Sequence, residues 1–592
     1  MSFFSDASLV YVPSGVKDAK TYSIKPTDGS GDLTFSRGSD IEATRVNANG
    51  YIEKAKVNLV LQSNTFSTTW SNTRSTESSG YAGYDGTNNA WKLEEDSNTG
   101  THILTQSVVS GAGVHTISCY FKAAERSGVQ FLLQGSTSYA YANFNLSTGA
   151  VQSSGQSGSF TLIEAKITSV GGGWHRASIA AATGVTTSEV KIYTLDAGFN
   201  TSYTGTTGEG IYLQDAQLNY GLVAQEYQET TTTSVVSGIT NDMPRLDYSG
   251  GASCPSLKLE PSRTNLIEYS EYLDGAPYKS RVSIANNAIV SPEGVQNAGK
   301  IVATSVSGTH AIDYIPNVVA SNYTMSVYAK AGEYSKFLLL TNNRGSNEAI
   351  GFDLNDVSTF PNDIGYLTPS ADRVSIEAVG NDWYKCSMTY AKDSSGTSGN
   401  GIYLTNDAEE STFTGNDSDG MYFWGWQMEA GSYPTSIIPT YGTSATRTED
   451  QSVSNDLTSF GFGNSYTVLF DMDLTEEINN VVNFEFKTST STTSLTARNF
   501  SGLFRVYDNI APLYPTGGIS SETKKWVMKV DGTSFAIFGV SGGVAVKNPY
   551  NGLIPRNLGY LSISASLSTI GIKKFIIFPT ALSDVDCGTL IL

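Results

Sequence analysis

The residues best suited to ligand chemistry are concentrated in one aromatic run. Residues 421–426 read MYFWGW, and a polar segment that ends in TRTED follows them. In an extended strand, Tyr422, Trp424 and Trp426 would point to the same side. Flat aromatic side chains can stack on sugar rings, and they also fill the cores of β-sandwiches. The run therefore predicts a glycan-binding surface, a buried core or a contact between subunits, and the sequence leaves these alternatives open.

Two of the four histidines are a second candidate. His102 and His310 each follow a Gly-Thr pair, whereas His115 and His175 do not. An imidazole ring can hold a structural hydrogen bond or contact a ligand. The shared context of His102 and His310 predicts a common structural hydrogen bond, with a glycan contact as the alternative.

Motifs for catalysis are weak in this chain. Residues 539–543 fit the G-x-S-x-G pattern, but such a nucleophile needs a strand-to-helix turn and a later histidine. A strand is predicted after this segment, and no histidine follows His310. A glycosidase needs only two carboxylates, so the 56 acidic residues make that alternative weak. We therefore expect no enzymatic activity, and a glycan hydrolase is the least favoured alternative.

Support for a metal or cofactor is also slight. Asp417 and Asp419 in the segment NDSDG resemble a fragment of a calcium loop, but a full loop needs more oxygen ligands. The alternative is a solvent-exposed turn that binds no metal. The four cysteines are far apart and form no CxxC pair, which favours free thiols and argues against zinc. We expect no cofactor, with structural calcium as the open alternative.

The bulk composition excludes several classes of partner. The chain has 592 residues and a net charge of −19, so it should repel nucleic acid. No apolar stretch approaches the roughly 20 residues that cross a bilayer. The first 15 residues lack a basic segment followed by an apolar one, so no secretory signal is expected.

A long internal repeat organises the chain. VNLVLQSNTF (57–66) matches TNLIEYSEYL (264–273), and GIYLQDAQLNYG (210–221) matches GMYFWGWQMEAG (420–431). Matching positions are 207 residues apart at Asn58 and Asn265 and 210 apart at Gly210 and Gly420. This small drift predicts two copies of one domain, called copy one and copy two below.

Each copy has the pattern of a β-sandwich. HTISCYFKA (115–123) and YTMSVYAKA (323–331) alternate apolar and polar residues, and Gly and Asn punctuate the chain at short intervals. The fold class predicted is all-β, with two tandem antiparallel jelly-roll sandwiches, a third sandwich and a short extended N-terminal segment. Trp70 and Trp91 occur only in copy one, which makes them freer to bind a glycan.

The repeat and the polar linkers set the expected domain boundaries. They are an N-terminal arm over residues 1–45, copy one over 46–228, a linker over 229–243, copy two over 244–445 and a third domain over 446–592.

The segments that open and close the copies resemble those of a known class of proteins. MPRLDYSGGASCPSLKLEPSRTNLIEYSE (243–271), its variant at residues 33–64, and the closing segment 422–450 are similar to segments of bacteriophage virion proteins of the tail-fibre or receptor-binding type. The copies resemble jelly rolls of carbohydrate-binding modules. The hairpin KVDGTSFAIFGV (529–540) and the ending IKKFIIFPTALSD (572–584) resemble a laminin-G or concanavalin-like domain. Copy one departs from the pattern, with Gln214 and Ala216 at the positions of the two tryptophans and no Tyr-Pro-Thr turn.

This resemblance implies a structural virion protein that attaches the particle to glycans on the host surface. The implied partners are host glycans and other virion proteins, the implied assembly is a homotrimer, and the implied location is the virion, after synthesis in the bacterial cytoplasm. A purely architectural component of the capsid, head fibre or tail is the alternative. The unmatched N-terminus is a candidate virion anchor or an extra strand on copy one. The anchoring candidates are Phe3, Phe4, Leu9, Val10 and Tyr11.

Overall fold

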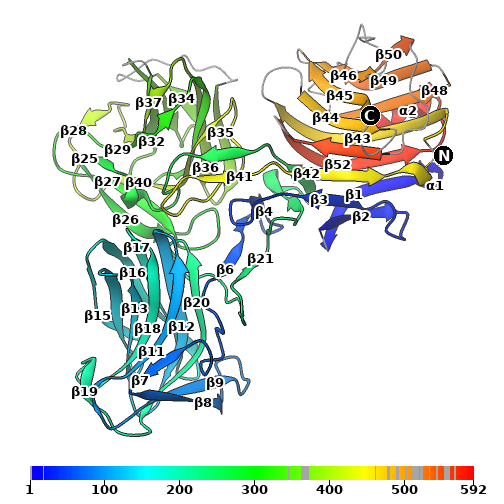
Figure 1. The fold of residues 1–592 in the computed structure, drawn as a ribbon. Coiled ribbons are helices and arrows are strands. Elements are labelled where there is room, and N and C mark those ends of the chain that lie inside the picture. The colour runs from blue at the N-terminus through cyan, green and yellow to red at the C-terminus, as the bar shows by residue number, and fades with distance from the viewer. Residues whose placement is uncertain are drawn as a thin grey trace.

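The computed structural model describes residues 3–592 except 18, 344–345, 362–372, 461, 477–480, 488–492, 501–502, 509–518, 521–523, 533, 542–543, 552–559 and 566–567. Strand accounts for 57% of the chain and helix for 4%, which confirms the all-β prediction. Three β-sandwiches are visible in Figure 1, with copy one at the bottom, copy two above it and a third sandwich beside copy two.

Copy one is a sandwich of two antiparallel sheets. The front sheet runs in the order β15 (Ala150–Ser157), β14 (Tyr139–Asn145), β13 (Gly128–Gln134), β18 (Thr187–Leu195), β11 (Ile103–Ser110) and β7 (Ser71–Thr73). The back sheet runs in the order β16 (Phe160–Gly171), β17 (Trp174–Thr183), β12 (Gly113–Ala123), β20 (Gly210–Tyr220), β9 (Ala90–Glu95) and β8 (Ser75–Tyr81). Inward residues such as Ile117 and Phe131 are fully buried between the sheets, as alternation along a strand predicts.

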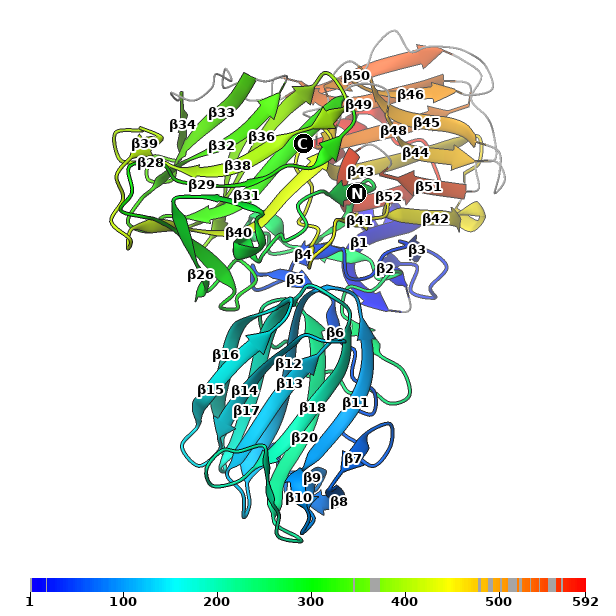
Figure 2. The same ribbon diagram turned by 60° about the vertical axis from the view of Figure 1, so that its left-hand side comes forward.

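Copy two repeats this architecture. Its front sheet runs in the order β34 (Ser358–Phe360), β33 (Ser346–Asp353), β32 (Lys336–Asn343), β38 (Gly399–Leu404), β29 (Ala311–Tyr314) and β25 (Tyr278–Ser280). Its back sheet runs in the order β35 (Val374–Gly380), β36 (Trp383–Lys392), β31 (Ser321–Lys330), β40 (Gly420–Ala430), β27 (Ala298–Ala303) and β26 (Val282–Ile289). Figure 2 shows both copies as stacked layers of strands.

The third sandwich is built from both ends of the chain. Its strands follow the order β47 (Ile519–Ser520), β46 (Leu503–Asp508), β45 (Thr493–Phe500), β44 (Val481–Lys487), β51 (Tyr560–Ser564), β42 (Gln451–Asp456), β3 (Leu33–Ser36), β2 (Lys20–Lys25), β1 (Leu9–Lys17), β52 (Ser568–Phe578), β43 (Ser465–Glu476), β48 (Lys525–Asp531), β49 (Ser534–Ser541) and β50 (Val544–Asn551). The hairpin of β22 (Arg245–Asp247) and β23 (Ser256–Leu259) also pairs with β52. The chain therefore returns to the third sandwich between the two copies, which the sequence did not predict.

The N-terminal residues are part of this third core. Leu9 and Tyr11 are fully buried in it, and Val10 is buried on the other side of β1. Phe3 packs edge-on against Phe578 with ring centroids 6.3 Å apart, and Phe4 alone among the anchoring candidates is more than half exposed. The expectation of a separate arm or of an extra strand on copy one is therefore wrong, because alternating apolar residues fill a core that lies more than 400 residues away in sequence.

Short elements complete the described chain. Six strand pairs close the ends of the copies: β4 (Thr44–Val46) with β5 (Ile52–Lys54), β6 (Lys56–Asn58) with β21 (Val235–Ser237), β24 (Arg263–Asn265) with β41 (Ala445–Arg447), β10 (Thr99–Thr101) with β19 (Ser202–Thr204), β28 (Gly308–Thr309) with β39 (Thr412–Phe413), and β30 (Asn317–Val318) with β37 (Gly396–Thr397). The helices are α1 (Phe3–Asp6) and α2 (Asp584–Ile591), with 3₁₀ turns at Ser249–Gly251, Leu273–Gly275 and Thr458–Phe460. Within the residues that the structure describes, no helix is long and apolar enough to span a bilayer.

One buried ionic cluster lies where the chain passes between the third sandwich and the copies. We call it the junction cluster: Arg37, Arg245, Glu260, Arg447 and Asp450. Glu260 forms ion pairs with Arg245 at 2.6 Å and with Arg447 at 3.0 Å, and Asp450 pairs with Arg37 and Arg245. All five side chains are at most 2% exposed. Burial raises the pKa of Glu260, but the guanidinium groups of Arg447 and Arg245 outweigh it and hold that pKa well below its usual range.

Candidate functional site

The aromatic run forms β40, and a bulge divides its side chains. Gly425 has a φ of +66°, and the register with β31 shifts at this point. Because the bulge adds one residue, Trp424 lies on the outer side of the back sheet while Trp426 points into the core. The prediction that Tyr422, Trp424 and Trp426 share one side is therefore wrong for Trp426.

The outer position of Trp424 is covered by other segments. Trp424 is fully buried beside Ile52 and Ile437, and the ring of Tyr328 meets it edge-on at 5.3 Å. Trp426 is 1% exposed, and Tyr422 is half-buried with the ammonium of Lys300 at 5.7 Å from its ring. Core packing, one of the alternatives left open by the sequence, is what the structure shows for both tryptophans.

The two tryptophans specific to copy one are also used for packing. Trp70 is 8% exposed, and Trp91 is half-buried. Their rings pack around Phe66 at centroid distances of 5.3 and 6.1 Å. The indole of Trp91 donates to the carbonyl oxygen of Asn64 at 3.0 Å. Trp70 is therefore largely covered, whereas Trp91 packs on one side and remains partly exposed.

The equivalent histidines make equivalent backbone hydrogen bonds. His102 Nδ1 donates to the carbonyl oxygen of Arg74 at 2.7 Å, and His310 Nδ1 donates to that of Arg281 at 2.7 Å. Both imidazoles are fully buried. The structure therefore shows the structural alternative for this pair, and neither residue reaches a surface on which a glycan could lie.

The calcium candidates lie in a turn. The carboxylate of Asp417 accepts from the backbone N–H of Ser305 at 2.9 Å, and that bond together with the Ser305 side chain lowers its pKa. Asp419 is half-buried, and its carboxylate accepts from the Ser418 hydroxyl at 3.0 Å. In the part of the chain that the structure describes, no group of three or more His, Cys, Asp or Glu residues is placed to hold a metal ion.

A different surface combines aromatic and polar side chains. We call it the front face of copy one, meaning the outward side chains of its front sheet: Gln130, Leu132, Gln134, Tyr139, Tyr141, Asn143, Glu189, Lys191 and Tyr193. They alternate along β13, β14 and β18 with core residues such as Phe131 and Ala142, which are fully buried. Three rows cross the strands: Asn143–Gln130–Tyr193, Tyr141–Leu132–Lys191 and Tyr139–Gln134–Glu189.

At the centre of the front face, two amide side chains are held in place by hydrogen bonds. Gln130 Nε2 donates to Asn143 Oδ1 at 2.7 Å, and Asn143 Nδ2 donates to Ser153 Oγ at 3.1 Å. Gln130 and Asn143 are 6% and 8% exposed, so larger side chains beside them cover most of their surface and restrict the orientation of the two amides. A preorganised amide pair can exchange several hydrogen bonds with a ligand without losing side-chain entropy.

Two tyrosines lie beside these amides. Tyr139 is 38% exposed, and its ring centroid is 6.2 Å from that of Tyr141. A Cβ at Gly155, opposite Tyr141 on β15, would come within 2.9 Å of the Tyr141 ring. The missing side chain at Gly155 therefore gives the Tyr141 ring room to lie against the sheet. The arrangement offers aromatic surface next to hydrogen-bonding groups.

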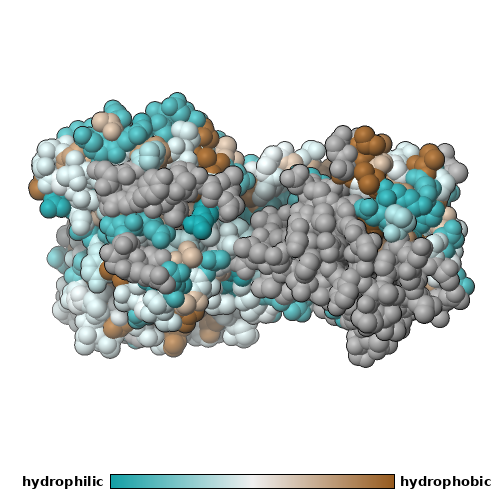
Figure 3. Space-filling model, turned by 90° about the horizontal axis from the view of Figure 1, so that it is seen from above, coloured by the Kyte–Doolittle hydropathy of each residue, from teal (hydrophilic) through white to brown (hydrophobic). Residues whose placement is uncertain are grey.

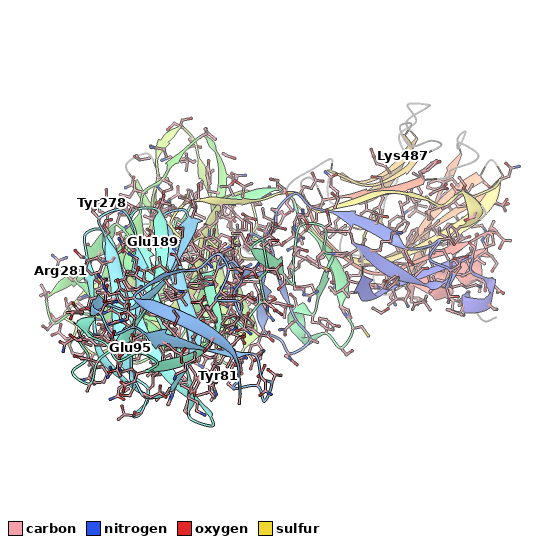
Figure 4. All side chains as sticks on the ribbon, turned by 60° about the horizontal axis from the view of Figure 1, so that its bottom comes forward. Tyr81, Glu95, Glu189, Tyr278, Arg281 and Lys487 are labelled. Atoms are coloured by element: carbon pink, nitrogen blue, oxygen red, sulfur yellow. The ribbon has the colours of Figure 1, made fainter. Side chains whose placement is uncertain are left out.

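The front face carries no net charge. Lys191 pairs with Glu189 at 2.9 Å and donates to Gln134 Oε1 at 2.8 Å; Glu189 is labelled in Figure 4. Burial, and then the charge of Glu189, raise the pKa of Tyr193, so its hydroxyl stays protonated. A neutral polar and aromatic face suits an uncharged ligand rich in hydroxyl groups.

The front face was not among the sites that the sequence predicted. Its signal is present in YAYANFN (139–145), where Tyr139, Tyr141 and Asn143 alternate with small or apolar residues. Alternation shows that these side chains share one side of a strand, but not that the opposite side is the core. Tryptophan drew attention to β40 because it is rare in this chain, and rarity does not distinguish a core from a surface.

Comparison with known proteins finds no relative by sequence and only weak likenesses among solved structures. No family model matches the chain, and no curated protein matches it. Among solved structures, the N-terminal CBM22-1–CBM22-2 tandem domain from Paenibacillus barcinonensis Xyn10C aligns over 64% of this chain and 98% of its own, at 13% identity and a TM-score of 0.17. The LG1–3 region of the laminin α2 chain aligns over 82% of this chain and 96% of its own, at 9% identity and a TM-score of 0.12. At these TM-scores the likenesses carry no argument about function, and neither description names a bacteriophage.

Proposed function

We propose that the protein is a non-catalytic glycan-binding β-sandwich protein and that the front face of copy one is a binding surface. The observation that carries this proposal is the placement of Tyr139 and Tyr141 beside the fixed Gln130–Asn143 amide pair on a neutral face. Aromatic rings stack on the apolar faces of sugars, and amides exchange hydrogen bonds with hydroxyl groups.

The biological setting belongs to the same proposal. The resemblance of residues 243–271 and 422–450 to bacteriophage virion proteins supports a host-attachment role on a virion, with other virion proteins as partners. The same resemblance supports a homotrimer, in which weak sites would gain apparent affinity from repetition. Light scattering on the purified protein measures the oligomeric state, and a monomer would remove this part of the proposal.

Binding to defined sugars tests the proposal. The probes are neutral hexaoses of glucose, mannose, galactose and xylose, together with surface polysaccharide extracted from bacterial cells. Replacing both Tyr139 and Tyr141 by alanine should weaken binding about 5- to 150-fold, since each stacking ring contributes about 0.5–1.5 kcal/mol. Isothermal titration calorimetry measures the change.

A matched tyrosine pair controls for general effects of the substitutions. Tyr81 and Tyr212 lie on the outer side of the back sheet of the same copy, with ring centroids 5.0 Å apart; Figure 4 labels Tyr81. Replacing that pair by alanine should leave binding unchanged. Equal losses in the two double variants would contradict the assignment of the front face, and no binding by the folded wild type would reject glycan binding altogether.

An architectural role is the second candidate, and one observation favours it. Trp424 and Trp426 are buried, and the junction cluster links the third sandwich to copy two, so much of the sequence that resembles virion proteins serves internal structure. Incorporation into particles without sugar binding would support this role.

A further inference from the structure

The two front sheets can be aligned residue by residue. Ile103 and Ala311 directly follow the equivalent histidines and lie opposite Tyr193 and Tyr403. Counting along the paired strands from these positions gives the equivalents of the front face. On β14 and β33, the equivalent pairs are Tyr139 with Asn347, Tyr141 with Ala349 and Asn143 with Gly351. On the other half of the sheets, the equivalent pairs are Lys191 with Gly401, Thr105 with Asp313 and Ser71 with Tyr278.

Apart from the equivalent Tyr193 and Tyr403, the two sheets place their outward tyrosines on opposite halves. Copy one has tyrosines on β14 and small residues at Ser71 and Thr105 on β7 and β11. Copy two has small residues at Ala349 and Gly351 on β33, and it carries Tyr278 on β25. A site on copy two would therefore lie near β25, β29 and β38, away from the positions used in copy one.

On the β25, β29 and β38 side of the front sheet of copy two, Asp313 is a partly buried carboxylate. It lies on β29 opposite Tyr278 on one side and Gly401 on the other. Tyr403 donates its hydroxyl to Asp313, at 3.0 Å from Oδ1 and 3.3 Å from Oδ2. A Cβ at Gly401 would come within 2.2 Å of Asp313 Oδ1, so the missing side chain makes room for the carboxylate above the sheet. Tyr278 is 55% exposed, and Figure 4 labels it at the edge of the molecule.

The carboxylate of Asp313 is poorly satisfied within the protein. Burial raises its pKa to about 6, and the hydrogen bond from Tyr403 lowers it only in part. Burial and the charge of Asp313 raise the pKa of Tyr403, which keeps that hydroxyl a donor. Among the described residues, Tyr403 from β38 donates to Asp313, Tyr278 from β25 lies opposite it in the strand register, and no cation forms an ion pair with it. A carboxylate can accept several hydrogen bonds, so this one retains capacity for a ligand.

We propose that Asp313, Tyr403 and Tyr278 form a second glycan site on copy two that binds a neutral sugar through two adjacent hydroxyl groups. The hydroxyl groups donate to the two carboxylate oxygens of Asp313, and the exposed ring of Tyr278 covers the apolar face of the sugar. This inference rests on the proposed glycan-binding function, but it uses different residues on a different copy.

Charge-assisted hydrogen bonds make this site distinguishable from the first. Binding at Asp313 needs the ionised carboxylate, whereas the front face of copy one is held by neutral amides and tyrosines. With a pKa of about 6, Asp313 is almost fully ionised at pH 7.5 and about one-tenth ionised at pH 5.0. Affinity at this site should therefore fall about tenfold between these two pH values.

The experiment isolates copy two in the full-length protein. Binding of the same hexaoses is measured by calorimetry for the wild type and for the Tyr139→Ala/Tyr141→Ala variant, at pH 7.5 and 5.0. Asp313→Asn and Tyr278→Ala are then each added to the double variant. We expect the double variant to retain saturable binding to at least one sugar and to lose about tenfold in affinity at pH 5.0. Adding Asp313→Asn should cost about tenfold or more in affinity, and adding Tyr278→Ala should cost about two- to tenfold. Thermal unfolding confirms that each variant is folded.

Each other outcome overturns the inference in a recognisable way. If the wild type binds and the double variant does not, copy one is the sole site, and the proposed function stands without this inference. If the double variant binds but neither Asp313→Asn nor Tyr278→Ala weakens it, the second site lies elsewhere. If the wild type binds no sugar, the proposed function and this inference both fail.

Discussion

The two copies share their framework and differ on their front faces. Asn58 and Asn265 each donate to two backbone carbonyls and accept from two backbone N–H groups at matching positions. Lys92 and Lys300 form matching ion pairs with Glu125 and Glu333. Side chains kept in both copies are thus explained by internal hydrogen bonds. Differences at exposed outward positions have no such explanation, and those positions are where binding residues should be sought.

The surface character of the molecule agrees with this division. Seen from above, hydrophobic residues lie in small groups among hydrophilic ones on the coloured surface (Figure 3). On the coloured part of this view, no broad apolar patch marks a partner. Such a surface suits a ligand that binds through mixed aromatic and polar contacts better than it suits a partner with a large apolar interface.

The largest expected difference between the copies is in the free energy of unfolding that is lost when Glu53 or Glu260 is replaced. Glu53 and Glu260 both stand five residues before the equivalent asparagines, but only Glu260 is buried between two arginines. Glu260→Ala leaves Arg245 and Arg447 short of a counter-charge and should cost about 3–5 kcal/mol of unfolding free energy, towards the upper end. Glu53 instead forms a half-buried pair with Arg45, and Glu53→Ala should cost only about 1 kcal/mol. Urea unfolding measures both; similar losses would show that the junction cluster does not set the stability of copy two.

The next contrast is between the equivalent residues Trp424 and Gln214. Trp424→Ala removes a fully buried ring from its cluster and should cost about 3–4 kcal/mol. Gln214 instead accepts from the backbone of Tyr84 at 3.1 Å and donates to Asn89 at 2.8 Å, so Gln214→Ala should cost about 1 kcal/mol. Neither change should affect sugar binding. A loss of binding in a folded Trp424→Ala variant would restore the aromatic run as a ligand site.

The sequence predicted the repeat and the sandwich class because both depend on local patterns. The repeat aligned Asn58 with Asn265, the Gly-Thr-His context aligned His102 with His310, and strand alternation indicated all-β structure. It did not predict that β1 joins β52, because pairing between strands so distant leaves no mark on either one. It placed Trp426 on the wrong side because one added residue at a bulge reverses the side of every residue after it. The front face was missed because alternation does not tell the inner side from the outer.

The bulge itself offers a smaller test of the comparison. Asp215 and Gly425 occupy the same bulge with φ values of +58° and +66°. At Gly425 a Cβ would also come within 2.5 Å of Ile437 and 2.9 Å of Tyr328, so Gly425→Ala should cost more than about 2 kcal/mol. Gly380 has a φ of +93° with open space around it, and Gly380→Ala should cost only about 1 kcal/mol. If Gly425→Ala and Gly380→Ala lower the free energy of unfolding by the same amount in urea, the residues around Gly425 must move to make room for the new methyl group. Copy one already has such room, because Asp215 occupies the same bulge.

The smallest expected effect is the pH dependence of stability. Burial raises the pKa of Asp215 in copy one and of Asp313 in copy two to about 6 in each case. Because the folded-state pKa lies above the unfolded value near 3.9, the protonated carboxyl stabilises the fold, and this contribution is lost as the pH rises through about 6. Asp313→Asn keeps a neutral side chain of the same shape, so it should raise the melting temperature at pH 7.5 and raise it about half as much at pH 5.0, where the unfolded-state carboxyl is already ionised.

Asp407, an exposed aspartate of the same copy, provides the control. Asp407→Asn should shift the melting temperature by the same small amount at both pH values. If Asp313→Asn behaves like this control, the carboxylate of Asp313 is already well solvated or paired in the free protein. It would then have little unmet hydrogen-bonding capacity to offer a sugar, and copy two would differ from copy one by lacking a site at all.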